Sequence, residues 1–231
     1  MLYIVGTPIG NLDDLSLRQA KTLASSDIIL AEDTRSARIL LDAIKKRFPQ
    51  LLPNIPNIIS YYKEKEFEKL PEVIDLLKEG KTISLISESG MPLISDPGFL
   101  LVKTIIKEKI PFTVIPGPSA LTTALIYSGF NPSNKDGGFM FLGYFPKQPS
   151  AALHYINIMK SIKKMLSEVI FVFYESPNRI NQTLQFIKVS GWNPDIVICR
   201  ELTKKFEEVV RGKADELLSR DYKGEITVLI I

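Results

Sequence analysis

Two carboxylates and a guanidinium stand together at Glu32, Asp33 and Arg35, directly after the apolar run Ile28–Ala31. A carboxylate can orient or deprotonate a hydroxyl group, and a guanidinium binds phosphate through paired hydrogen bonds. The same residues could instead form a helix N-terminus, in which an acidic side chain caps the helix and pairs with the arginine. The motif therefore indicates either a substrate-anchoring site or a local cap.

Three glycine- and proline-containing stretches follow other apolar runs, at Gly6–Asn11, Ser87–Gly98 and Pro116–Ala120. Open α/β sheets bind ligands at the carboxyl ends of their strands, and glycine allows the backbone to approach a bound molecule closely. The first stretch lacks the G-x-G-x-x-G spacing, and Pro8 removes an N–H that would bind phosphate. These loops therefore favour a flat or uncharged ligand over a pyrophosphate. For any one of them, an ordinary strand-to-helix connection is the alternative.

Basic residues also follow predicted strands. Each one alone is typical of a charged turn, but together they favour one shared cleft for a polyanion. They are Arg35, Arg179, Arg200, Lys204 and Lys205. His154 lies on a predicted helix without a second histidine or an acidic pattern, and we expect it at the surface.

The elements that must carry these residues alternate between strand and helix in the first half of the chain. This rhythm predicts right-handed βαβ crossovers and a mostly parallel sheet. The predicted strands cover residues 2–5, 28–31, 58–61, 82–87 and 112–115. The predicted helices cover 16–24, a segment beginning at Thr34 or Ser36, 70–77 and 100–107, with a proline-rich connection over 49–56.

Pro116 interrupts this rhythm, and we place a domain boundary there, giving domains of residues 1–115 and 116–231. In the second domain some strands follow one another without a helix, which predicts a mixed sheet. Its predicted strands cover 139–142, 169–174, 196–200, 207–211 and 226–231, and its helices 119–127, 151–166 and 180–189. The predicted fold class is α/β, with two α/β domains.

The composition is that of an ordinary globular enzyme. The chain has 231 residues, 45% of them hydrophobic and 24% charged, with a net charge of +3. This mildly basic balance is compatible with RNA or another anionic partner. The chain has one cysteine, Cys199, so it cannot form an internal disulfide. One cysteine and one histidine are too few ligands for a structural zinc site. The sequence has no signal-peptide pattern and no apolar run of about 18 residues, so we expect a cytoplasmic protein without a metal.

Several motifs together resemble one known family, the tetrapyrrole methylases (class III). They resemble most closely its bacterial branch, which methylates the ribose 2′-hydroxyl of a cytidine in 16S ribosomal RNA. The likeness runs in order from Leu2 to Ile231. The motifs are LYIVGTPIGNLDDLSLRQAKTL, AEDTR, SGMPLISDPGFLLV, PGPSALTTAL, FYESPNRI, RELTKKFEEVVRG and KGEITVLII.

This resemblance implies a homodimeric enzyme with two α/β domains that binds S-adenosylmethionine in the cleft between them. It implies that the first domain carries the substrate side and part of the cofactor cleft, and that the second completes cofactor binding. The E-D-T-R motif is typical of the RNA-methylating branch. Because this motif follows a predicted strand, we expect Glu32 or Asp33 to accept or orient the proton of the ribose hydroxyl and Arg35 to bind the adjacent phosphate. The implied cofactor contacts are Pro8, Ser89, Gly90, Met91, Ile94, Ser119, Ala120, Tyr174, Glu175 and Leu202. The implied partner is 16S rRNA in the 30S subunit.

The chain departs from that branch at several positions, including the segment 61–67, where the branch typically has a segment with histidine and asparagine. Glu88 and Ser89 stand in Ser87–Gly90, where the branch usually has S-D-A-G, and Asn178 stands where it often has histidine. Two other functions therefore remain open. One is methylation of a small tetrapyrrole-type molecule, and the other is RNA binding without catalysis.

Overall fold

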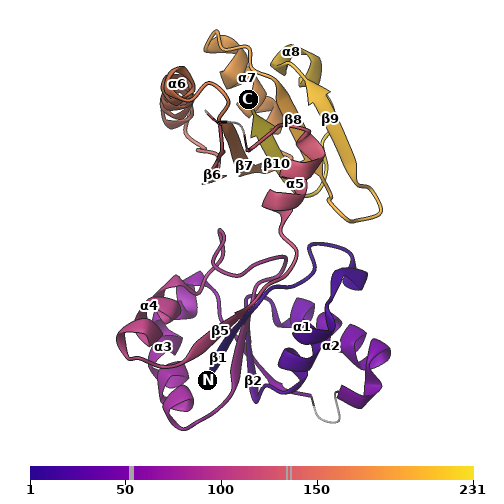
Figure 1. The fold of residues 1–231 in the computed structure, drawn as a ribbon, viewed down its shortest axis with the longest axis vertical. Helices are drawn as coiled ribbons and strands as arrows, with labels where there is room; N and C mark the ends of the chain where they lie inside the picture. The colour runs from indigo at the N-terminus through magenta and orange to yellow at the C-terminus, as the bar shows by residue number, and fades with distance from the viewer. Residues whose placement is uncertain (52–54, 134, 136) are drawn as a thin grey trace. The chain divides into compact units, whose positions relative to one another are not determined.

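The structure, a computed structural model, describes residues 1–51, 55–133, 135 and 137–231. The chain divides into two compact units, Met1–Ser119 and Ala120–Ile231 (Figure 1). The sequence placed the domain boundary at Pro116, but residues 116–119 belong to the first unit by their contacts. The physical reason is close backbone packing, since a Cβ atom on Gly117 would lie 2.9 Å from the Cα atom of Gly6.

The first unit contains a parallel sheet with the strand order β3-β2-β4-β1-β5. Each neighbouring pair in this order runs parallel. The strands are β1 (Leu2–Val5), β2 (Ile28–Ala31), β3 (Asn57–Ser60), β4 (Ile83–Ile86) and β5 (Phe112–Ile115). This confirms the parallel sheet that the alternating pattern predicted, and β1, β2 and β5 have the predicted bounds.

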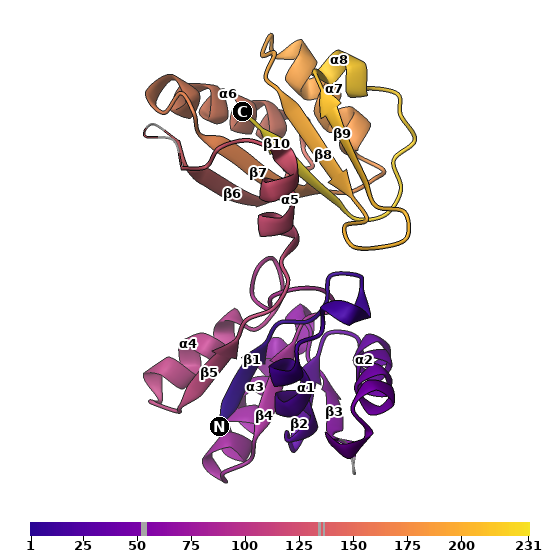
Figure 2. The same cartoon turned by 45° about the vertical axis from the view of Figure 1, so that its right-hand side comes forward.

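Helices cover both faces of this sheet (Figures 1 and 2). Ile29 and Ala31 of β2 pack in one core with α1 and α2, whereas Ile28 and Leu30 pack in the other core with α3 and α4. Successive side chains of a strand point to opposite faces, so a strand covered on both faces is apolar throughout. The helices are α1 (Leu17–Ala24), α2 (Thr34–Arg47), α3 (Lys63–Lys78) and α4 (Phe99–Lys107), with short 3-10 turns at Leu12–Asp14 and Pro49–Leu51.

Helix α3 is longer than the sequence predicted. The prediction placed this helix over residues 70–77. In the structure α3 begins at Lys63 and contains Pro71 in its interior. The predicted connection over residues 49–56 includes the turn Pro49–Leu51, while residues 52–54 lie outside the described part of the chain.

The second unit contains a mixed sheet with the strand order β6-β7-β10-β8-β9. Strands β6 and β7 pair in parallel, and the other neighbouring pairs are antiparallel. This confirms the predicted mixed sheet. The strands are β6 (Phe139–Tyr144), β7 (Ile170–Glu175), β8 (Ile196–Arg200), β9 (Glu208–Gly212) and β10 (Ile226–Ile230).

The helices of the second unit pack on opposite faces of this sheet. Residues of α6, α7 and α8 share one core with Phe171, Phe173 and Val228. Helix α5 packs against β10 and β8, and Ala124 and Leu125 are its buried apolar residues. The helices are α5 (Ala120–Ser128), α6 (Pro149–Met165), α7 (Ile180–Val189) and α8 (Ala214–Leu217).

Candidate functional site

The loops at the carboxyl ends of β1, β4 and β5 are joined by backbone hydrogen bonds. The N–H of Thr7 donates to the carbonyl oxygen of Gly90 at 2.8 Å, and the N–H of Gly6 donates to that of Ile115 at 3.0 Å. The Ser87 hydroxyl donates to the same Gly90 oxygen at 3.2 Å. The three loops that the sequence singled out therefore form one structure at one edge of the first sheet.

Glycine is required where these loops meet. A Cβ atom on Gly6 would lie 2.6 Å from the sulfur of Met91 and 2.8 Å from the Cα atom of Gly117. The fully buried Gln19 fixes the same point, because its side-chain amide donates to the Gly6 carbonyl oxygen at 2.7 Å. The loops thus converge too tightly for a Cβ atom at either Gly6 or Gly117.

The loop between β4 and α4 has an unusual backbone. Leu93 and Ser95 have positive φ angles of 70° and 74°, in addition to Gly90 and Gly98. A non-glycine residue in this region costs about 1–2 kcal/mol, and such strain persists only where the surroundings enforce it. Glu66 of α3 holds the far end of the loop, because its carboxylate accepts the N–H of Leu100 at 2.9 Å and so caps α4.

Glu32 stands beside this loop because of the strand register. Ala31 of β2 lies opposite Ile86 of β4, so the residues that follow each strand emerge side by side. Partial burial, and then the charges of Glu88 and Glu64, raise the pKa of the Glu32 carboxyl. No hydrogen bond from a described residue reaches that carboxylate. A carboxylate whose pKa is raised toward neutrality and which has no fixed partner is suited to accept a proton.

Asp33 and Arg35 form the cap and ion pair that the sequence offered as the alternative. The Asp33 carboxylate accepts the backbone N–H of Arg35 at 2.7 Å and caps α2. It also pairs with the Arg35 guanidinium at 2.7 Å. Hydrogen bonds from Arg35 lower the pKa of Asp33 to about 2, which makes it a poor base. The Arg35 side chain is 88% exposed and is accessible to a phosphate.

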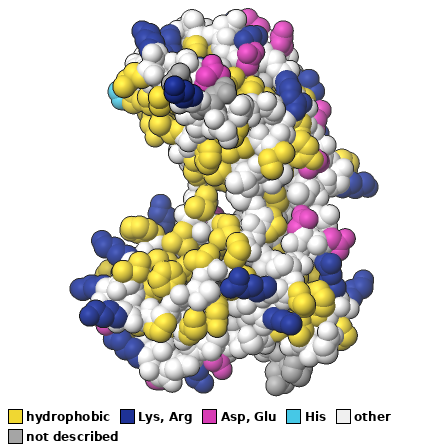
Figure 3. All heavy atoms as spheres, viewed as in Figure 1, with side chains coloured by type: hydrophobic (Ala, Val, Ile, Leu, Met, Phe, Trp, Pro, Cys, Tyr) yellow, Lys and Arg dark blue, Asp and Glu magenta, His cyan; other side chains and the backbone are white. Residues whose placement is uncertain are grey.

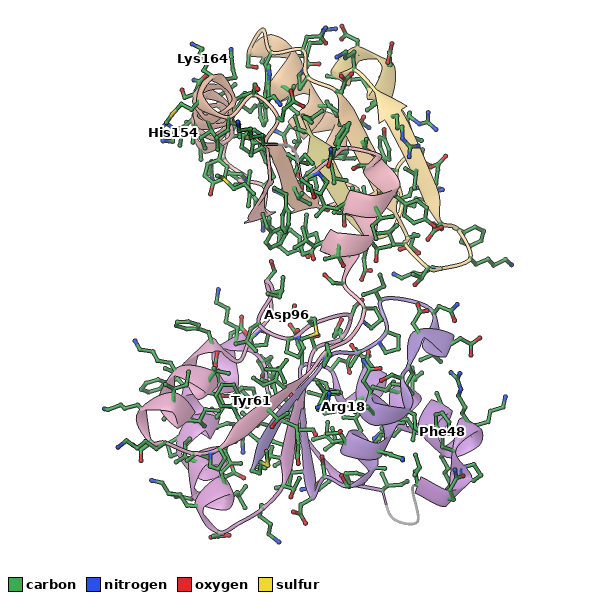
Figure 4. The ribbon with its side chains drawn as sticks, viewed as in Figure 1. Arg18, Phe48, Tyr61, Asp96, His154 and Lys164 are labelled. Carbon is green, nitrogen blue, oxygen red and sulfur yellow. The ribbon has the colours of Figure 1, made fainter. Side chains whose placement is uncertain are left out.

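The predicted cofactor contacts of the first unit lie on the joined loops. Pro8 and Gly90 are buried, Ser89, Met91 and Ser119 are half-buried, and Ile94 is exposed. Asp96, from the same loop as Ile94, is labelled in Figure 4. The structure brings the Gly6, Met91 and Gly117 positions together, whereas Ile94 lies in the strained part of the loop.

The other predicted contacts belong to the second unit. Ala120 begins α5, Tyr174 and Glu175 end β7, and Leu202 is buried just after β8. The Glu175 carboxylate is fully buried and already bound: it accepts the Thr183 hydroxyl at 2.6 Å and the Ser176 N–H at 2.7 Å, and it pairs with Arg179. A contact between Glu175 and the predicted cofactor would therefore involve the Glu175 backbone.

Most of the predicted basic groups are paired, which corrects the interpretation of all five as free cations for a polyanion. Arg179 pairs with Glu175, Arg200 with Glu208 at 2.7 Å, and Lys204 with both Glu201 and Glu225. Lys205 has no ion pair with any residue that the structure describes. Figure 4 labels His154 on α6, where it is exposed as predicted.

The sequence did not single out Gln19 and Glu66 as positions that hold these loops. The S-x-x-Q pattern of Ser16 and Gln19 predicted only a helix start, and it does form a capping box. The buried placement of Gln19 and Glu66 depends on tertiary packing, which has no periodic signal. Glu88 was noted as a departure from the family pattern, and the register of β2 and β4 gives it a role beside Glu32.

Searches for a metal site and for a membrane span were negative within the described residues. No three His, Cys, Asp or Glu side chains there are arranged to bind a metal ion. None of the helices in that part of the chain combines the length and apolar character that a membrane span needs.

Comparisons with known proteins identify the family and agree with the fold. Residues 1–218 match the family described as Tetrapyrrole (Corrin/Porphyrin) Methylases. The chain is 40% identical to the ribosomal RNA small subunit methyltransferase I of Thermotoga maritima, over 99% of this chain and 97% of that protein. It is 39% identical to the protein of the same name from Mycoplasmopsis pulmonis, over 99% of this chain and 96% of that protein.

Solved structures show the same fold at much lower identity. Diphthine synthase superposes with a TM-score of 0.71 at 10% identity, covering 99% of this chain and 88% of that chain. The methyltransferase CobJ superposes with a TM-score of 0.68 at 14% identity, covering 99% and 92%. These structures establish the fold, and the sequence relatives confirm the resemblance. The chain therefore belongs to the tetrapyrrole methylases and, within them, to the ribosomal RNA small subunit methyltransferase I family.

Proposed function

We propose that this methyltransferase transfers a methyl group from S-adenosylmethionine to the ribose 2′-hydroxyl of a cytidine in 16S rRNA of the 30S subunit. One observation carries the proposal. Glu32, a carboxylate with a raised pKa, and the Gly90 loop, the predicted donor-binding segment, follow paired residues of adjacent strands. A proton acceptor and a donor-binding loop are thus side by side.

The residues of this edge fit the donor. Gly6, Met91 and Gly117 pack so closely that an added Cβ atom would clash, which holds the three predicted cofactor loops together. Glu88 and Glu64 both contribute to the raised pKa of Glu32, so three carboxylates share this neighbourhood. Negative charge there favours a positively charged sulfonium over an anionic cofactor. When bound, S-adenosylmethionine supplies an electrophilic methyl group on sulfur.

The chain's own residues must then align and deprotonate the acceptor. A ribose hydroxyl is a weak nucleophile at neutral pH, and a positioned base accelerates such a step by roughly 10²–10⁴-fold. We assign that proton to the Glu32 carboxylate. Arg35, exposed at the first turn of α2, would bind the neighbouring phosphate, and Asp33 would hold the Arg35 guanidinium in place. Alignment of the reacting atoms supplies the larger part of the acceleration.

The rRNA substrate is favoured over a tetrapyrrole by the sequence relatives. The relatives at 39–40% identity carry the name ribosomal RNA small subunit methyltransferase I, whereas CobJ, a structural neighbour, is 14% identical. Retention of Glu32, with its raised pKa, argues against an RNA-binding protein that has lost catalysis.

We propose a homodimer, as the family resemblance implies. Strand β5 is an edge strand of the first sheet, and hydrophobic side chains gather over β5 and α4 in Figure 3. The exposed ones are Phe99, Ile106, Phe112 and Val114. An exposed apolar edge is a surface that a second copy could cover. Sedimentation equilibrium should give twice the chain mass of 26.0 kDa, and a monomer at micromolar concentration would contradict this.

The proposal is tested with tritiated S-adenosylmethionine and 30S subunits that lack ribose methylation. The label should enter 16S rRNA at a single cytidine and make the following phosphodiester bond resistant to alkali, because alkaline cleavage needs a free 2′-hydroxyl. Methylated 30S subunits serve as the matched control and should take up no label. Label on a base, or transfer only to a tetrapyrrole added in a parallel reaction, would overturn the proposal.

A further inference from the structure

We propose that the tip of the loop between β8 and β9 is an RNA-docking element, in which Phe206 stacks on an unpaired base and Lys205 binds an adjacent phosphate. This inference rests on the proposed rRNA substrate. It adds a contact on the second unit, distinct from the residues assigned to methyl transfer.

The loop that carries these residues is held in one conformation. Its backbone N–H groups at Thr203 and Lys204 donate to the Glu207 carboxylate at 2.6 Å and to the Glu201 carbonyl oxygen at 2.9 Å. Glu201 and Thr203 have positive φ angles of 49° and 64°. The Glu201 carboxylate also accepts the N–H of Glu225 at 3.0 Å, which ties the loop to the start of β10. A preorganised loop loses little conformational entropy on binding.

Among the described residues, the other charged side chains of the loop have hydrogen-bond or ion-pair partners within the protein, whereas Lys205 has neither. Lys204 pairs with Glu201 at 3.1 Å and with Glu225 at 2.9 Å. The Glu207 carboxylate accepts the Tyr127 hydroxyl at 2.7 Å in addition to the Thr203 N–H. Lys205 is exposed and has no carboxylate partner in the described part of the chain. The loop therefore offers one available cation for an anionic group.

Phe206 supplies the second half of the contact. Its side chain is 64% exposed, and the Lys205 ammonium lies 5.5 Å from the centre of its ring. Figure 2 shows the β8–β9 connection as an open loop that extends past the ends of these strands. An exposed aromatic ring beside a lysine is the combination with which proteins bind single-stranded RNA, since the ring stacks on a base and the cation binds phosphate.

The exposed Phe67 of α3 shows what distinguishes Phe206. Phe67 is 81% exposed on helix α3, and no lysine or arginine of the described residues lies over its ring, whereas Lys205 lies over the ring of Phe206. Phe67→Ala is therefore a control that removes an exposed ring without an adjacent cation.

The first experiment measures steady-state methylation of unmethylated 30S subunits by Phe206→Ala, Phe206→Tyr and Phe67→Ala. Loss of one stacking contact corresponds to about a 5- to 150-fold change in RNA binding. We expect Phe206→Ala to raise KM for 30S subunits by that factor, with KM for S-adenosylmethionine unchanged. Phe206→Tyr and Phe67→Ala should match the wild type. An unchanged KM for 30S in Phe206→Ala would overturn the inference.

A second experiment measures base stacking at position 206 in the absence of methyl transfer. It distinguishes failure of the proposed function from failure of this inference. The Phe206→Trp variant is titrated with a single-stranded cytidine-rich RNA oligonucleotide, and its fluorescence should be quenched. The wild type, whose one tryptophan is Trp192, should show no quenching. Equal signals in both proteins contradict stacking at Phe206. A change in the sedimentation of Phe206→Ala would assign the tip to contact between copies instead.

Discussion

Glu32 comes directly after Ala31 of β2 and Glu88 comes two residues after Ile86 of β4, and Ala31 and Ile86 are paired in neighbouring parallel strands, so the two carboxylates are close enough to interact electrostatically. The charge of Glu88 is, after burial, the largest cause of the raised pKa of Glu32. The negative charge of Glu88 therefore adjusts the carboxyl group to which we assign proton transfer. This relationship connects strand register to the pH dependence of the reaction.

Replacement of Glu88 should shift the pH dependence of methylation. Glu32 acts as a base only when ionised, so activity should fall as the pH drops through its raised pKa. Glu88→Gln removes a neighbouring negative charge, lowers the pKa of Glu32 and should move the acidic limb of the kcat/KM profile to lower pH. Glu79→Gln, at the end of α3 and absent from the causes of the shift, should leave the limb in place. A limb unchanged by Glu88→Gln would contradict the coupling.

Because Gly6 and Gly117 pack closely together, Gly117→Ala should weaken the binding of S-adenosylmethionine. The added Cβ atom would lie 2.5 Å from the Gln19 side-chain nitrogen and 2.9 Å from Gly6. Overpacking of this kind costs about 1–3 kcal/mol and must displace the loop. Calorimetric titration should show weaker S-adenosylmethionine binding by at least about tenfold. Gly129→Ala is the control, because a Cβ atom there meets no other atom and only the φ angle of +72° opposes the change. It should lower stability slightly and leave the affinity for S-adenosylmethionine unchanged. An equal loss of affinity in both variants would refute a local effect of Gly117.

Glu66 should stabilise the first unit through the N-terminus of α4. Gly98, the N-cap residue, offers no side chain, and the Glu66 carboxylate accepts the N–H groups of Leu100 and Leu101 instead. Glu66→Ala leaves these donors without a partner and should reduce the free energy of unfolding by about 1–3 kcal/mol in urea titrations. Glu68→Ala, exposed on the same helix, should change it by less than about 0.5 kcal/mol. Similar effects of the two changes would exclude the capping role.

Replacement of Tyr61 should not destabilise the first unit, in contrast to replacement of Glu66. The Tyr61 hydroxyl group is buried without a hydrogen-bond partner among the described residues. Figure 4 labels this residue in the first unit. Burial, with the Glu66 charge, raises the pKa of Tyr61, so the phenol is neutral. Tyr61→Phe removes a desolvated hydroxyl and should leave thermal stability unchanged or raise the free energy of unfolding by up to about 1–2 kcal/mol.

The matched control for this change is Tyr222→Phe in the second unit. The Tyr222 hydroxyl is buried and donates to the Leu217 carbonyl oxygen at 2.9 Å. Its removal should cost about 0.5–1.5 kcal/mol. A loss of stability in Tyr61→Phe as large as that in Tyr222→Phe would mean that the Tyr61 hydroxyl has a bound partner, such as water.

Local sequence signals predicted most of the fold. Strand Ile28–Ala31 was predicted with the bounds observed, because a short β-branched run between polar segments has few alternatives. The start of α3 was missed by seven residues, since the charged segment before Pro71 lacks a clear apolar stripe. Tertiary contacts, such as Glu66 with α4 or Gln19 with Gly6, leave no periodic trace in the sequence.

The candidate site was predicted in part. The sequence identified the E-D-T-R motif but left open whether it is a cap or a catalytic group. The structure separates the members: Asp33 caps α2 and pairs with Arg35, while Glu32 has no hydrogen-bond partner among the described residues. Such a division depends on side-chain direction after β2, which composition and spacing do not encode.

The assignment of the base is tested most directly by the single-turnover rate of methyl transfer to unmethylated 30S subunits, for Glu32→Gln beside Asp33→Asn. Glu32→Gln should be slower by roughly 10²–10⁴-fold, with unchanged affinity for S-adenosylmethionine. Asp33→Asn keeps a capping side chain and should lose much less activity. A Glu32→Gln variant that methylates at the wild-type rate would contradict the account.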